Sequence, residues 1–187
     1  MRFVLASQSP ARLRTLRDAG VRPEVIVSDV DEDAISGSAT GARTGELVLR
    51  LATAKATAVA EQLSGDVLVL GCDSMLDLDG EALGKPDSVA AAVERWRAMR
   101  GHTGTLWTGH CLHDCASGRT VTDAALTSVR FADVRDEEIE LYCGTGEPSR
   151  VAGGFTIDGL GGWFAEVVEG DHHNVVGLSL SELRTLL

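Results

Sequence analysis

The chain has 187 residues, of which 44% are hydrophobic and 24% charged. A chain of this length buries one sizeable core and is short for two, so we expect a single domain over residues 1–187. Its formal net charge of −11 would repel a polyanion, which argues against nucleic-acid polymers and anionic membranes as partners. No apolar stretch approaches the roughly 20 residues that span a bilayer, and no signal-peptide cleavage site is visible, so the sequence predicts a cytoplasmic protein.

The first twenty residues have the pattern of an anion-binding turn between a strand and a helix. The apolar run 3–6 is followed by Ser7 and Ser9, either of which can cap a helix, and by Pro10, which suits a first helical turn. The free backbone N–H groups of such a helix start carry roughly half a positive charge. Arg12 is close enough to reach round to a bound phosphate, so we expect a phosphate site here.

The next segment predicts a strand at 24–27, an acidic run that contains Glu32, and a Gly/Ser/Thr-rich loop over 36–44. Residues 46–62 then show helical spacing of apolar side chains. In that pattern Lys55 falls toward the side opposite the apolar stripe, which predicts an exposed position.

A continuous apolar run at 66–71 predicts a strand buried on both faces. Asp73 follows it after one residue, Cys72, where open α/β sheets usually place their chemistry. Residues 75–78 and 81–83, separated by an Asp-Gly turn, predict a hairpin. A Gly-Lys-Pro sequence closes that arm, and its fixed geometry would let Lys85 project back toward Asp73.

The remaining segments continue the alternation of helices and strands, which predicts the α/β class. A glycine-dense segment at 151–162 would let the backbone approach a ligand or another strand closely. The other expected elements are a helix at 88–100, strands at 105–112 and 120–131, a short helix at 136–143, a strand at 164–168 and a final helix capped by Ser179.

A structural zinc site is an alternative use of the crowded segment that holds His110, Cys111, His113 and Cys115. Alternation along a strand would place Cys111 and His113 on one face and His110 on the other, which divides the set.

Five motifs, in this order along nearly the whole chain, resemble the actinobacterial branch of the Maf family of nucleoside triphosphate pyrophosphatases. They are Ser7-x-Ser9-Pro10-x-Arg12, Gly71-Cys72-Asp73-Ser74, Leu83-Gly84-Lys85-Pro86, the segment from Gly153 to Gly159, and Asn174-Val175-Val176-Gly177-Leu178. The resemblance implies an inosine-triphosphatase-like α/β fold with a mixed sheet and two lobes around a nucleotide cleft, usually in a homodimer. It also implies cleavage of a nucleoside triphosphate into the monophosphate and pyrophosphate with a divalent cation, Mg²⁺ or Mn²⁺.

The resemblance assigns roles to positions of this chain that match the family's motifs. Asp73 matches the catalytic carboxylate and Lys85 the lysine after the hairpin. The matched substrate-binding positions are Ser7, Ser9 and Arg12 of the phosphate loop and Lys55 on the following helix, with Glu32 at the acidic position after the second strand. Because magnesium is commonly held by one or two carboxylates together with phosphate oxygens, Asp73 and Glu32 are the expected metal ligands.

The chain departs from the commonest family pattern at positions associated with base selection. Ala11 stands where the branch that cleaves dTTP and UTP has a first arginine, Ser74 where it has threonine, and Asp158 where it has glutamine. Arg150 and Val151 replace an aspartate-lysine pair. Ser74 and Asp158 are therefore expected to contact the substrate, with the preferred base left open.

A second class of function is a non-catalytic regulator, because the Maf family is also linked to arrest of septum formation. Such a protein would bind a nucleotide without consuming it, whereas an enzyme, a hydrolase of acid anhydrides, would release pyrophosphate and could remove modified nucleotides. A P-loop phosphoryl transferase is excluded, since the chain has no Gly-x-x-x-x-Gly-Lys-Ser/Thr sequence.

Overall fold

The computed structural model describes residues 1–39 and 41–187. Within these ranges, seven strands form one sheet in the order β2-β1-β3-β5-β6-β7, with β4 paired to β3. The strands are β1 (Arg2–Leu5), β2 (Glu24–Val25), β3 (Val67–Leu78), β4 (Glu81–Leu83), β5 (Thr103–Asp114), β6 (Thr120–Phe131) and β7 (Ala165–Gly170). β1 runs parallel to β2 and β3, and the other pairings are antiparallel. The predicted α/β fold with a mixed sheet is confirmed.

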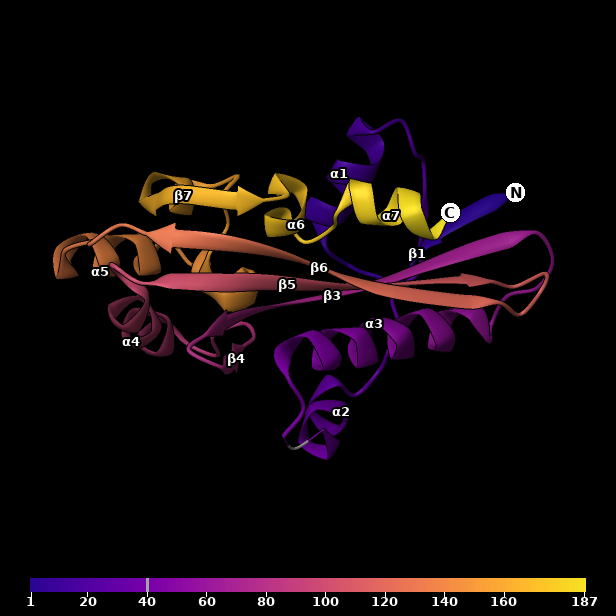
Figure 1. The fold of residues 1–187 in the computed structure, drawn as a ribbon, viewed down its shortest axis with the longest axis horizontal. Helices are drawn as coiled ribbons and strands as arrows, with labels where there is room; N and C mark the ends of the chain where they lie inside the picture. The colour runs from indigo at the N-terminus through magenta and orange to yellow at the C-terminus, as the bar shows by residue number, and fades with distance from the viewer. Residues whose placement is uncertain (40) are drawn as a thin grey trace.

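Helices cover both faces of this sheet. They are α1 (Pro10–Asp18), α2 (Glu32–Ser38), α3 (Thr44–Ala60), α4 (Val89–Met99), α5 (Asp136–Gly144), α6 (His172–Val176) and α7 (Leu180–Leu186), with 3-10 turns at Pro148–Arg150, Ala152–Gly154 and Leu160–Phe164. Figure 1 shows the long strands β3, β5 and β6 running the length of the molecule, with α3 below them and α1 and α7 above at one end, and α4, α5 and β7 at the other. None of the helices in the described ranges is long and apolar enough to cross a membrane.

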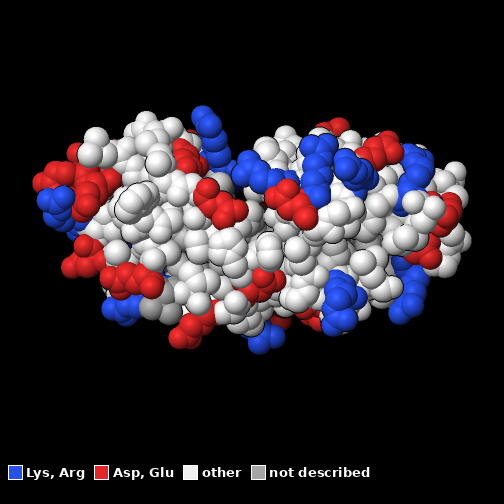
Figure 2. Space-filling view, turned by 90° about the horizontal axis from the view of Figure 1, so that it is seen from above, with Lys and Arg blue, Asp and Glu red and all other residues white. Residues whose placement is uncertain are grey.

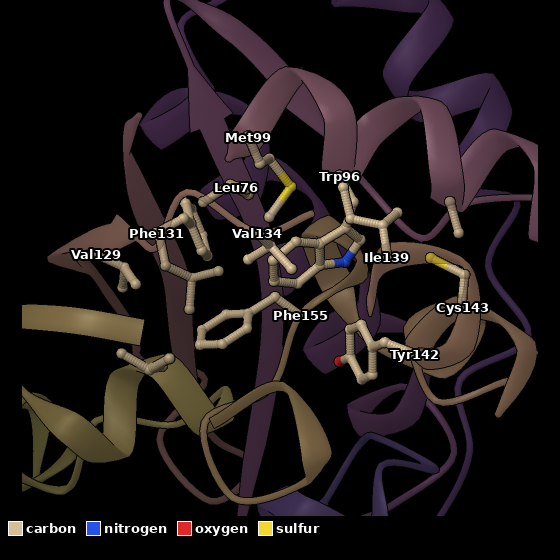
Figure 3. Close-up of a cluster of buried hydrophobic side chains, with 13 residues drawn as sticks. Leu76, Trp96, Met99, Val129, Phe131, Val134, Ile139, Tyr142, Cys143 and Phe155 are labelled. Carbon is tan, nitrogen blue, oxygen red and sulfur yellow. The ribbon is translucent and has the colours of Figure 1, made fainter. Parts of the chain in front are cut away.

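The core at the α4 and α5 end is built around Trp96. Its ring makes edge contacts with Phe131, Tyr142 and Phe155, with centroids 5.6, 5.3 and 6.3 Å away (Figure 3). The buried indole N–H donates a 2.9 Å hydrogen bond to the carbonyl of Gly154. Such edge contacts and a satisfied N–H make a rigid aromatic anchor. It fixes the glycine-dense segment against the sheet.

At the other end, α3 lies directly against β3 and β5 because two glycines remove the side chains between them. A Cβ at Gly71 would overlap the carbonyl oxygen of Ala52, and one at Gly109 would overlap that of Val48. Glycine is therefore required at both positions for close packing rather than for a turn. This contact sets the distance between α3 and the sheet and, with it, the position of Lys55.

Two predicted boundaries were wrong. The strand expected at 66–71 continues to Leu78, because β5 pairs with it along this whole stretch while the parallel pairing to β1 stops at Leu70. Asp73 therefore lies within a strand and not at its end. The loop expected at 36–44 begins later, since Asp31 accepts from Ala34 N at 2.9 Å and caps α2. Residue 40 of that loop lies outside the described residues.

His110 is fully buried between β5 and the start of α7, where its Nε2 accepts a 2.9 Å hydrogen bond from Ser179 N. Burial, with a smaller contribution from Arg12, lowers its pKa from 6.5 to about 4. Below pH 6.5 the His110 imidazole is protonated in the unfolded chain, whereas in the folded chain it stays neutral until the pH approaches 4. The stability that His110 contributes above that pH is therefore lost as pH falls toward 4, by roughly 3 kcal/mol in all.

The His110→Gln variant, which keeps an acceptor for Ser179 N, is expected to lose this part of the pH dependence. Urea unfolding of both proteins between pH 4 and 7 measures it. If the free energy of unfolding of the two proteins changed with pH in the same way, His110 would not be the cause of this pH dependence.

Candidate functional site

A cleft of about 640 Å³ opens between the two ends of the molecule. Its walls come from residues 6–12, α2 and α3, residues 73–75 of β3, the segment after β4, residues 150–152 and the end of α6. Figure 2 shows a notch between two halves of the surface, with basic side chains on both sides of it. Among the described residues, the charged side chains that line the cleft are Arg12, Lys55, Lys85 and Arg150, and Glu32, Asp33, Asp73 and Asp87. The cleft is thus balanced in charge, whereas the chain as a whole is strongly acidic.

Lys55 joins the two carboxylates that the sequence assigned to the metal. Its Nζ lies 2.6 Å from Asp73 Oδ1 and 2.9 Å from Glu32 Oε1. The Lys55 and Asp73 side chains are only 8% and 9% exposed. The prediction that Lys55 points away from the buried side of its helix is wrong. α3 lies over the middle of the sheet, so a residue off its apolar stripe still faces β3.

Burial raises the pKa of the Asp73 carboxyl above its usual range, and the charges of Lys55 and Arg12 offset part of that rise. A carboxylate whose pKa is raised is a better proton acceptor than an ordinary aspartate. The environment of Asp73 therefore suits a general base.

Arg12 is held by three hydrogen bonds from three parts of the chain. Its Nε donates to Gly177 O at 2.7 Å, Nη1 to Ser7 Oγ at 3.1 Å and Nη2 to Ser74 Oγ at 2.9 Å. Ser74 in turn contacts Thr108 at 2.9 Å. A guanidinium has five N–H groups, so some donors are left for a ligand. Arg12 is thus a pre-positioned cation at the cleft wall.

The start of α1 has the geometry that the sequence predicts. Ser9 caps the helix by accepting from Arg12 N at 3.4 Å, and Pro10 is the first helical residue. Ser7 Oγ accepts from Ser9 N at 3.2 Å, which leaves the Ser7 hydroxyl proton for another partner. Both serines line the cleft.

Lys85 and Arg150 line the cleft without a side-chain partner among the described residues. Both are exposed. The backbone holds their two segments together, because Gly153 N donates to Gly84 O at 2.9 Å. The sequence identified Lys85 as catalytic but treated Arg150 only as a departure from a motif. No local pattern marks Arg150, since its place in the cleft depends on contacts between segments far apart in the chain.

Asp158 does not line the cleft. Its Oδ1 lies 3.4 Å from His172 Nε2, and the side chain is 42% exposed. By contrast, Ala11 and Ser74, the other two positions linked to base selection, are in the cleft wall. The structure therefore brings together Ser7, Ser9, Arg12, Glu32, Lys55, Asp73, Ser74 and Lys85 and leaves Asp158 apart.

The donor set at Glu32 and Asp73 fits a magnesium-type ion that is held mainly by phosphate oxygens. The two carboxylates lie on either side of one ammonium group, because both contact Lys55 Nζ. Mg²⁺ typically takes one or two carboxylates and completes its shell with water and substrate phosphates. Within residues 1–39 and 41–187, no group of three or more His, Cys, Asp or Glu side chains is placed to hold a metal.

The His residues of the alternative zinc site lie apart from its Cys residues. His110 bonds Ser179 N, whereas Cys111 belongs to the apolar cluster between α3 and the sheet, and Cys115 packs against that cluster. His113 Nδ1 contacts Thr120 Oγ1 at 2.8 Å. These side chains therefore serve packing and cross-strand contacts within the fold.

The comparison with protein families covers nearly the whole chain. The family described as Maf-like protein matches residues 2–187. A protein of Streptomyces coelicolor named nucleoside triphosphate pyrophosphatase is 56% identical, covering 100% of this chain and 89% of its own length. One of the same name from Corynebacterium efficiens is 51% identical, covering 100% and 93%. The solved Ham1 protein of Staphylococcus aureus aligns with a TM-score of 0.49 at 21% identity, over 71% and 73% of the two chains. The chain belongs to the Maf-like protein family.

Proposed function

We propose that this protein is a nucleoside triphosphate pyrophosphatase that hydrolyses its substrate to the monophosphate and pyrophosphate. The observation that carries the proposal is the buried ion pair of Lys55 with Asp73, together with the contact of Lys55 with the more exposed Glu32, in one cleft with Arg12 and the start of α1. The names of the similar proteins from Streptomyces coelicolor and Corynebacterium efficiens support the same activity.

The substrate's charge explains why the cleft needs these groups. The negative oxygens of a triphosphate repel the lone pair of an attacking water. Catalysis therefore requires cations at the phosphates and a base for the water. Ser7, Arg12 and the N–H groups of α1 would hold phosphate oxygens. Lys85, which has no partner in the described chain, would bind the rest of the phosphate chain.

Asp73 would accept the proton of the water that attacks the α-phosphorus, and pyrophosphate would leave. Glu32 and Asp73 would hold a divalent cation, Mg²⁺ or Mn²⁺, which when bound neutralises phosphate oxygens and lowers the pKa of water. Removal of modified nucleotides, a homodimeric assembly and a cytoplasmic location belong to the same proposal, and rest on the family resemblance.

The competing function is a nucleotide sensor without turnover. The two functions differ in one measurement, which is pyrophosphate release from ordinary and modified nucleoside triphosphates with Mg²⁺ or Mn²⁺. An enzyme releases pyrophosphate from at least one of them. Nucleotide binding without any release would support the sensor and overturn the enzyme.

Arg150→Gln is expected to raise KM about 10-fold, because a hydrogen bond to a charged group is lost while the fold is untouched. The change in kcat should be smaller. Steady-state kinetics on a substrate that the wild type cleaves measures both constants. Arg119→Gln is the control, since Arg119 is also exposed but lies in the turn between β5 and β6, away from the cleft. Equal KM values for the two variants would contradict a role for Arg150 in binding.

A further inference from the structure

We infer that the ammonium group of Lys55 takes the place of the divalent cation between Glu32 and Asp73 in the nucleotide-free protein, and leaves that place when phosphates bind. The inference rests on the proposed function, because it concerns the order in which metal and nucleotide reach the same site.

The contacts of Lys55 show how closely the ammonium occupies the metal position. It lies 2.6 Å from an oxygen of Asp73 and 2.9 Å from an oxygen of Glu32, the two expected ligands. A divalent cation entering between the same oxygens would meet a positive charge a few ångströms away. At that separation, beside Lys55 and Asp73 side chains that are only 8% and 9% exposed, the repulsion between the two cations is large. The nucleotide-free protein should therefore bind the metal weakly.

The two ends of this bridge differ in exposure, which gives the ammonium a way out. The Asp73 side chain is 9% exposed, whereas the Glu32 side chain, on the short helix α2, is 55% exposed. The Glu32 contact is thus the weaker one. A lysine side chain has four flexible methylene groups, so its ammonium can turn from Glu32 to a phosphate oxygen in the same cleft.

The arrangement has a thermodynamic consequence. Phosphates that draw Lys55 away remove the repulsion, so nucleotide binding raises the affinity for the metal, and the metal raises the affinity for nucleotide by the same factor. Lys55 would in this way prevent the carboxylates from being loaded with metal before a substrate arrives.

The test is Mn²⁺ binding to the nucleotide-free protein, followed by electron paramagnetic resonance. Without nucleotide, Lys55→Met is expected to bind Mn²⁺ at least about 10-fold more tightly than the wild type. The variant also lacks a cation that would contact the phosphates of a bound nucleotide. The control is Lys85→Met, which removes the same charge from the same cleft but from a side chain with no partner in the described residues. Its Mn²⁺ affinity should stay within about 3-fold of the wild type.

Unchanged or weaker Mn²⁺ binding by Lys55→Met, or an equal gain in Lys85→Met, would overturn the inference. If Lys55→Met does not fold, Lys55→Gln is measured instead, with the same expected result and the same contradicting results. Neither readout needs turnover. Failure of the proposed function would instead appear as a wild type that releases no pyrophosphate from any nucleoside triphosphate.

Discussion

Replacing Asp73 by Asn is expected to lower the rate of pyrophosphate release by roughly 10²- to 10⁴-fold, the range for loss of a general base. The side chain keeps its shape but no longer accepts a proton, and Lys55 keeps only Glu32 as an ionic partner. Turnover by the purified variant, measured with saturating nucleotide and cation, gives the effect on kcat.

The matched control for this variant is Asp79→Asn. Asp79 lies in the exposed turn between β3 and β4, outside the cleft, and has a φ of 52° that asparagine tolerates well. Its turnover should equal that of the wild type. Full activity of Asp73→Asn would show that this carboxylate is not the base, however well the variant folds.

Gly71→Ala is expected to destabilise the protein by about 3 kcal/mol, at the upper end of overpacking effects. The added methyl group would meet the backbone of α3 at Ala52 and Ala56, which cannot move as a flexible side chain does. Any relief that lifts α3 from β3 also separates Lys55 from Asp73, so activity should fall together with the melting temperature. Thermal unfolding and pyrophosphate release of the same preparation test both effects.

Gly144→Ala is the control for the glycine substitution. Gly144 ends α5, and a Cβ there would meet no atom within 4 Å. Alanine in a helix avoids an entropic cost of about 0.5–1 kcal/mol, so this variant should be unchanged or slightly more stable. A Gly71→Ala protein as stable and active as Gly144→Ala would mean that the contact of α3 with β3 does not position Lys55.

The parts of the site that the sequence predicted are those set by local chemistry. The Ser-x-Ser-Pro sequence determines a capped helix start within four residues, and the structure has Ser9 as the cap and Pro10 as the first helical residue. The Asp-Gly turn likewise forms the predicted hairpin, with positive φ at both Asp79 and Gly80.

The parts that the sequence did not predict depend on contacts between distant segments. The inward position of Lys55 follows from how far α3 extends over the sheet, and the length of β3 follows from its pairing with β5. Neither is encoded in the spacing of neighbouring residues. For the same reason the sequence did not predict that Arg150 lines the cleft. Asp158, which a motif assigned to base contact, lies beside His172 instead.

The most direct test of the proposed reaction is hydrolysis in water labelled with a heavy oxygen isotope. The products are separated and their masses are measured by mass spectrometry. If water attacks the α-phosphorus in this cleft, the products are a nucleoside monophosphate that carries the label and an unlabelled pyrophosphate. Label in the pyrophosphate, or release of a nucleoside diphosphate and inorganic phosphate, would contradict the proposed chemistry.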